Sequence, residues 1–118
     1  MIACKKYMDF SAYCKKTSNF AVLDFIHLLI RGLCLEICVN KHQTTNIVLH
    51  IRSDGHLCIG TSKESTISTL FFSKLECILI ENTCNINLFD TSSNQVWYTI
   101  VLPSVQSAII FKSKYDSL

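Results

Sequence analysis

Charge is scarce in this sequence. Only 17% of its 118 residues are charged, whereas 49% are hydrophobic, and this balance excludes an intrinsically disordered chain. The formal net charge of +2 is small and scattered along the chain, which excludes a basic nucleic-acid-binding surface. We therefore expect one globular domain with a sizeable apolar core and no nucleic-acid partner.

Features of a membrane anchor or a targeting signal are also lacking. The most apolar window, residues 20–39, is interrupted by Asp24, His27, Arg31 and Glu36. A charge near the centre of a membrane helix costs about 2.5–3.5 kcal/mol, so we expect no membrane span. The first residues contain no signal-peptide core, and no lipidation motif is present. Seven cysteines in such a chain are typical of reduced thiols. These features indicate a cytoplasmic protein, with a membrane-peripheral location as a further option.

Motifs of catalysis and cofactor binding are absent. The sequence has no glycine-rich dinucleotide loop, P-loop, nucleophile elbow or H-E-x-x-H motif. Structural zinc usually needs paired C-x2-C knuckles, and the chain has none. Two groups of residues come nearest to a ligand set: Cys34, Cys38 and His42, and His50, His56 and Cys58. We expect no cofactor, no metal and no enzymatic activity, with a cysteine- or metal-dependent enzyme as a remote alternative.

The last quarter of the chain has the clearest pattern. Residues 95–102 alternate as a strand, and Pro103, the only proline, ends it because proline has no N–H to donate. Ser104 can then cap a new helix. The apolar residues that recur at helical spacing are Val105, Ala108, Ile109 and Tyr115. This pattern predicts a terminal helix that packs on a sheet.

A second helix is predicted over residues 20–31, ended by Gly32. The residues that fall on one face of it are Phe20, Leu23, Ile26, His27 and Ile30. Two Lys-Lys pairs flank aromatic residues before it, which suits either a packed arm or a basic segment that contacts a partner or a membrane. We assign residues 1–32 to an N-terminal arm and helix, and residues 33–118 to the main domain.

Seven short strands are predicted between the two helices. Apolar and polar residues alternate over 33–39, 47–52, 56–60, 69–72, 74–81, 84–89 and 95–102. Ser53-Asp54-Gly55 predicts a hairpin turn, because Asp-Gly tolerates positive φ. The polar runs 40–46 and 61–68 are predicted loops. The expected fold is α+β or mainly β: a seven-stranded antiparallel barrel or sandwich with an N-terminal helix and a C-terminal capping helix.

This plan resembles the pleckstrin-homology superfold, which includes the PTB domains. A more specific resemblance, over residues 20–118, is to the third lobe of a FERM domain. It consists of the Ser53-Asp54-Gly55 turn, the aromatic strand at Phe71-Phe72 that leads into an apolar one, and Leu102-Pro103-Ser104 before the helix.

The resemblance implies binding and not catalysis. In PTB-like members, a peptide adds as an extra strand beside strand five, against the C-terminal helix. The peptide-binding residues implied here are Leu75, Ile78, Ile80, Val105, Ile109 and Lys112. Phosphoinositide-binding members of the superfold converge several cations on one phosphate, and the implied contacts here are Lys41, His50 and Arg52.

The function expected from these features is that of a scaffold or adaptor module that binds a peptide or a protein tail. The alternative is a structural subunit of a larger multi-protein assembly, because so little charge suits a surface that is buried against other chains.

Overall fold

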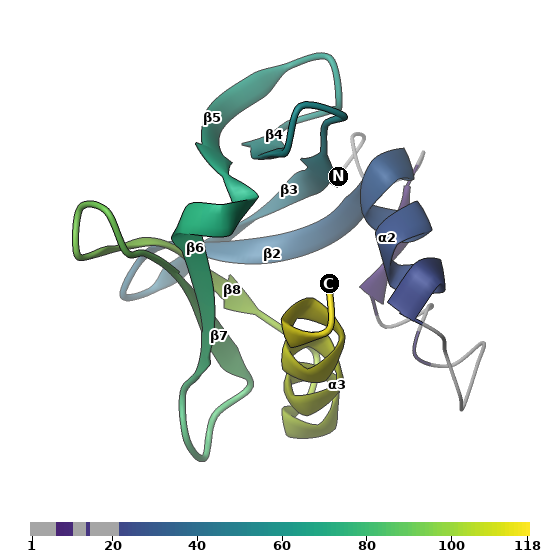
Figure 1. Ribbon diagram of the computed structural model, residues 1–118. Helices are drawn as coiled ribbons and strands as arrows, with labels where there is room; N and C mark the ends of the chain where they lie inside the picture. Colours follow the sequence, from purple (N-terminus) through teal and green to yellow (C-terminus); the bar gives the residue numbers. More distant parts are fainter. Residues whose placement is uncertain (1–6, 11–13, 15–21) are drawn as a thin grey trace.

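The computed structural model describes residues 7–10, 14 and 22–118 (Figure 1). Its elements are β1 (Met8–Asp9), α2 (Val22–Arg31), β2 (Leu33–Asn40), β3 (Gln43–Ile51), β4 (His56–Gly60), β5 (Thr66–Phe71), the 3-10 helix η2 (Phe72–Lys74), β6 (Leu75–Leu79), β7 (Asn85–Asp90), β8 (Gln95–Val101) and α3 (Val105–Asp116).

A curved antiparallel sheet of seven strands forms the body of the molecule (Figure 1). The strand order is β5-β4-β3-β2-β8-β7-β6, and the two-residue β1 pairs with β2 in parallel. β5 and β6 follow one another in the chain but form opposite ends of this order. With a helix before the sheet and one after it, this architecture confirms the predicted fold class.

The polar hairpin between β2 and β3 departs from the sequence prediction. A loop is predicted over residues 40–46, but the strands continue to Asn40 and Gln43, and only Lys41 and His42 connect them. Polar residues of this hairpin pair across the two strands, as Glu36 does with Asn46 and Asn40 with Gln43, so the ladder includes a segment of loop-like composition. β5 likewise begins at residue 66, inside the predicted loop 61–68.

The turns and caps follow the sequence prediction. Gly55 has φ 88°, and the Arg52 N–H donates to the His56 carbonyl at 2.9 Å, which closes the predicted hairpin turn. Gly32 has φ 105° and ends α2 by donating its N–H to the Leu28 carbonyl.

The core lies between the inner face of the sheet and the two helices. Phe10, Phe25 of α2 and Phe111 of α3 are buried, and their rings meet edge to face with centroids 5.4 to 6.2 Å apart. Strand residues complete this core: Leu33, Leu35, Ile37, Ile47, Leu49, Leu57, Ile59, Leu75, Cys77, Ile86, Leu88 and Ile100. Neither helix of the described chain is long and apolar enough to cross a membrane.

The buried face of α2 differs from the predicted face. Phe25, Leu28 and Leu29 are buried, whereas His27 is exposed and Ile30 is 47% exposed. Phe20 and the side chain of Leu23 lie outside the described residues. His27 and Arg31 lie on the side of this helix opposite Leu29, so helical spacing does point to the buried face, and the predicted face was wrong because it included His27.

α3 confirms half of its predicted core face. Ala108 and Tyr115 are buried together with Phe111, but Val105 is 50% and Ile109 45% exposed. Ser104 caps this helix as predicted, because its side chain accepts from the Ser107 N–H at 3.0 Å. The exposed pair therefore lies on a side of α3 that the sheet leaves uncovered.

Candidate functional site

β6, which corresponds to predicted strand five, forms one end of the sheet, and α3 packs against it (Figure 1). Two hydrogen bonds fix which of its backbone groups meet β7. The Lys74 carbonyl accepts from the Thr91 N–H at 2.9 Å, and the Ile80 N–H donates to the Asn85 carbonyl at 3.1 Å. Bonding residues alternate in an antiparallel pair, so Cys77 directs its N–H and C=O away from β7.

Lys112 of α3 covers this outward-facing edge. Its Nζ donates to the Cys77 carbonyl at 2.9 Å and to Asp116 Oδ2 at 2.7 Å. The hydrogen bond to Asp116 raises the pKa of Lys112, so the ammonium stays charged at neutral pH. Cys77 is only 1% exposed. Leu79, the next residue whose backbone N–H and C=O point away from β7, is half-buried. The edge of β6 is thus closed at its middle by one flexible side chain.

The other predicted peptide-binding residues do not share one surface. Leu75 is buried in the core. Ile78 is 38% exposed on the opposite face of β6, because side chains alternate along a strand. Ile80 is half-buried just after β6, and Val105 and Ile109 form an exposed pair one turn apart on α3.

The predicted phosphoinositide contacts are not brought together. Lys41 lies in the turn before β3, and Arg52 lies just after its end, nine strand residues later. At about 3.3 Å per residue, this strand separates them by roughly 26 Å. His50 is buried, and Arg52 forms an ion pair with Asp54 at 3.0 Å.

The candidate metal ligands and the thiols are dispersed. Within residues 7–10, 14 and 22–118, no three His, Cys, Asp or Glu side chains gather as a metal site would require. Five of the described cysteines are free, as predicted: Cys14, Cys38, Cys58, Cys77 and Cys84. Cys34 is disulfide-bonded, so the expectation of reduced thiols is wrong at this residue. Burial raises the pKa of the Cys58 thiol and raises that of Cys77 to about 12, so neither thiol is poised to form a thiolate.

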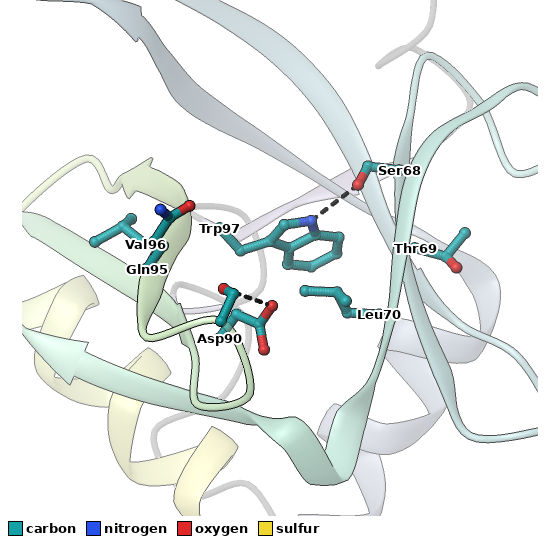
Figure 2. A pocket seen from close by; sticks show the side chains of 8 residues that line it. Ser68, Thr69, Leu70, Asp90, Gln95, Val96 and Trp97 are labelled. Atoms are coloured by element: carbon teal, nitrogen blue, oxygen red, sulfur yellow. Dashed lines mark hydrogen bonds between the residues drawn. The ribbon is translucent and has the colours of Figure 1, made fainter.

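A cleft of about 240 Å³ lies between β5 and the β7–β8 hairpin (Figure 2). Trp97 of β8 reaches across it, and its Nε1–H donates to Ser68 Oγ of β5 at 2.8 Å. Leu70 of β5 lies beside the indole ring, whereas the side chain of Val96 points away from that ring and is 47% exposed (Figure 2). The remaining lining residues are Thr69, Asp90, Ser93 and Gln95.

Among the described residues that line this cleft, Asp90 is the only acidic or basic one. Its Oδ1 accepts from the N–H and the hydroxyl of Ser92, and its Oδ2 accepts from the hydroxyl of Ser93 at 2.9 Å. The hydrogen bond from the Ser92 side chain is the main cause of a lowered pKa for Asp90, so the carboxylate is ionised at neutral pH.

The sequence does not indicate this cleft. Ser68 and Trp97 are 29 residues apart, and Ser68 falls in a predicted loop. A tryptophan next to the polar turn 90–94 is the one local signal, because a buried indole needs a hydrogen-bond acceptor. The acceptor, Ser68 of β5, comes close to Trp97 only because the whole sheet is curved.

The chain is similar in fold to a solved protein from Toxoplasma gondii. No protein-family model matches the sequence, and no curated protein matches it either. Among solved structures, it resembles Inner Membrane Complex (IMC) Sub-compartment Protein 3 from Toxoplasma gondii. The TM-score is 0.62 at 13% sequence identity, over 81% of this chain and 80% of that one. A likeness at this identity shows a shared fold. Nothing in these comparisons supports the resemblance to the third FERM lobe.

Proposed function

We propose that this chain is a non-catalytic protein-interaction module that binds an extended peptide along β6, beside α3. The observation that carries the proposal is the position of β6 at the end of the strand order, with backbone groups directed away from β7. An added strand would use these groups for main-chain hydrogen bonds, while neighbouring side chains select the sequence.

The edge of β5 suits strand addition less well. The β4–β5 register shifts between Ile59 and Gly60, and such a bulge twists an edge away from a partner. β6 pairs with β7 without interruption from Leu75 to Leu79. It also has α3 beside it, where Ile109 offers an exposed apolar side chain to a bound peptide.

Lys112 sets a condition on this binding. A peptide N–H can reach the Cys77 carbonyl only after the ammonium of Lys112 leaves it, while Asp116 can retain the charge. Lysine on a sheet edge also protects the edge from indiscriminate pairing. In the proposed function, Lys112 therefore acts as a displaceable cover and not as part of a side-chain pocket.

The strand order and the terminal helix support an assignment to the pleckstrin-homology and PTB type of fold, in which this mode of binding is known. Lipid binding has weaker support, because Lys41 and Arg52 lie at opposite ends of β3. Catalysis by a cysteine has little support too, since burial raises the thiol pKa of Cys58, the cross-strand neighbour of His50.

A structural subunit of a larger assembly is the second candidate. Among the residues that the structure describes, eight large apolar side chains are exposed, and they belong to both helices and several strands: Ile30, Val39, Ile67, Phe71, Ile78, Val96, Val105 and Ile109. One bound peptide would not cover them all. The similar Toxoplasma protein is named as a component of a sub-compartment of the inner membrane complex, which favours work in an assembly at the periphery of a membrane.

The parity of strand bonding offers a direct test of peptide addition. Nine-residue peptides would be selected from a random display library on the folded protein, and the best one would be resynthesised with N-methyl groups on every second residue. Two methylated versions are made, one with the odd and one with the even residues methylated. Methylation blocks the N–H groups that face β6 in one version and those that face solvent in the other. We expect methylation to abolish binding in one version and to leave it within about threefold in the other. Equal effects in both versions would contradict strand addition.

A further inference from the structure

The cleft between β5 and the β7–β8 hairpin contains an indole ring that is held in one orientation. Trp97 is half-buried, its N–H is taken by Ser68, and its ring packs edge-on against Tyr98 at 5.1 Å between centroids. Figure 2 shows the ring within the cleft, with Leu70 beside it. Because the N–H is already bonded, a ligand would meet the face or edge of the ring.

The charge in the cleft has one sign. Asp90 is ionised, and none of the described lysines or arginines forms an ion pair with it. The serine hydroxyls that hold the carboxylate also orient it. Ser93 bonds to the carboxylate through its hydroxyl and its backbone N–H, and the two carboxylate oxygens have about four lone-pair sites in all, so the carboxylate can still accept a donor from outside the turn. An oriented carboxylate next to an aromatic ring, without a cation of its own, is complementary to a positively charged group.

We propose that this cleft binds an arginine side chain of a partner polypeptide. The guanidinium stacks on Trp97 and donates to the carboxylate of Asp90, and the aliphatic stem lies against Leu70. A guanidinium fits better than an ammonium, because it is planar, weakly hydrated and able to stack and donate hydrogen bonds at once. This site is separate from the edge of β6, so it does not depend on the proposed function.

Hydrogen bonding within the 90–94 turn is the competing explanation of Asp90. Aspartate often accepts from the backbone and hydroxyls of the residues that follow it, and that role alone would account for Ser92 and Ser93. It does not account for an indole fixed beside the same carboxylate, nor for a cleft of about 240 Å³ with no neutralising cation. The two roles are compatible, since the turn uses only part of the capacity of the carboxylate.

Trp97 provides the readout, because it is the only tryptophan in the chain. Its indole N–H gives a single cross-peak in a proton–nitrogen NMR spectrum. The probes are three blocked tripeptides, acetyl-glycyl-X-glycyl-amide, in which X is arginine, lysine or the neutral isostere citrulline. We expect the arginine peptide to shift this cross-peak saturably. The affinity obtained from the titration should be at least about fivefold higher than that of the citrulline peptide, and it should decrease at high salt.

Two variants test the role of charge in the cleft. Asp90→Asn removes the charge and should weaken arginine binding by about tenfold. Gln95→Lys places a competing cation at an exposed lining position and should weaken it similarly, which keeps the test decisive if Asp90→Asn does not fold. Asp54→Asn, in the exposed turn before β4, is the matched control and should have no effect.

A saturable shift that is selective for arginine and weakened by Gln95→Lys supports the site. An equal shift with the citrulline peptide would overturn it, since the ring would then bind without regard to charge. Absence of any shift up to high millimolar peptide, or full binding in Gln95→Lys, would overturn it as well.

Discussion

At the residue scale, His50 connects burial with pH. It is 5% exposed on β3, and its Nδ1 has no hydrogen-bond partner among the described residues. Burial is the main cause of its lowered pKa, and the nearby charges of Lys63 and Arg52 lower it further. The unfolded chain, with an ordinary histidine pKa near 6.5, therefore binds a proton more readily than the folded chain.

From this difference we expect the free energy of unfolding to decrease as the pH falls below about 6.5, and to level off below the folded pKa of His50. His50→Leu should flatten this dependence, because leucine does not titrate and suits an apolar site. Urea denaturation at pH 7.5 and 5.5 measures the effect. His42→Leu, in the exposed β2–β3 turn, is the control. An unchanged pH dependence in His50→Leu would contradict the account.

Asp54 defines a separate, more acidic window. Its hydrogen bonds with the backbone and side chain of His56 lower the pKa of the carboxyl to about 2. Its contribution to stability is therefore complete above the ordinary value of 3.8, and it is lost between 3.8 and about 2. A measurement between pH 7.5 and 5.5 does not reach this window.

Trp97 and Ser68 test how β8 is joined to β5. Ser68→Ala removes the acceptor of the indole N–H and should cost about 1 kcal/mol. Trp97→Ala should cost more, about 2–3 kcal/mol, which is less than for a fully buried tryptophan because the ring is half-exposed. Denaturation followed by circular dichroism measures both, since Trp97→Ala has no tryptophan fluorescence. Costs below 0.5 kcal/mol for both would show that this contact does not stabilise the fold.

At the element scale, β6 and α3 are joined through the side chain of Lys112, which the proposed peptide binding would have to move. Lys112→Met keeps an unbranched stem but cannot donate to the Cys77 carbonyl. We expect it to tighten the binding of a selected peptide by up to about tenfold, because a charge-assisted hydrogen bond no longer has to be broken.

Lys114→Met is the matched control for this change. It removes the same charge two residues further along α3, on a different face of the helix. Isothermal titration with the same peptide compares the two variants. Weaker binding in Lys112→Met would contradict the role of a cover, and it would favour the sequence-based expectation that Lys112 contacts the bound peptide.

The elements themselves follow from the sequence more closely than their contacts do. Period-2 patterns, the turn at Asp54-Gly55 and the cap at Ser104 are local features, so the strands and helices were predictable. The buried face of α2 was predictable too, because Leu29 lies opposite the polar residues His27 and Arg31, whereas Ile30 lies next to His27. The hydrogen bond of Lys112 was not, because it depends on the packing of a helix against a strand 35 residues away.

At the scale of the whole molecule, the exposed apolar surface determines whether the chain associates with other chains. The Cα radius of gyration is 13.1 Å, close to the value of about 13.5 Å expected for a compact chain of this length. Among the described residues, the exposed apolar side chains belong to many different elements. An interaction module with such a surface should be monomeric by itself.

Light scattering coupled to gel filtration tests this expectation. We expect one species near the 13.4 kDa of the single chain at 10 to 200 μM. Phe71→Ser and Ile109→Ser, which remove exposed apolar side chains from two distant elements, should leave that mass unchanged. A dimer or larger species that either variant dissociates would favour the structural-subunit alternative.

The likeness to the Toxoplasma protein also belongs to this scale. At 13% identity the two chains share the course of the backbone, so the comparison supports the architecture. Which partner the chain binds has to be argued from the side chains on its surface. That surface has two separate candidate sites: the edge of β6 and the cleft at Trp97. Each can be removed without the other.

The most direct test of the central claim is amide hydrogen exchange of the β6 residues, with and without a selected peptide. Strand addition predicts that the amides of Cys77 and Leu79, which point away from β7, exchange more slowly in the complex, while those of Ile78 and Ile80 change little. Protection that appears only in β5 or around Trp97, with Cys77 and Leu79 unchanged, would contradict the account.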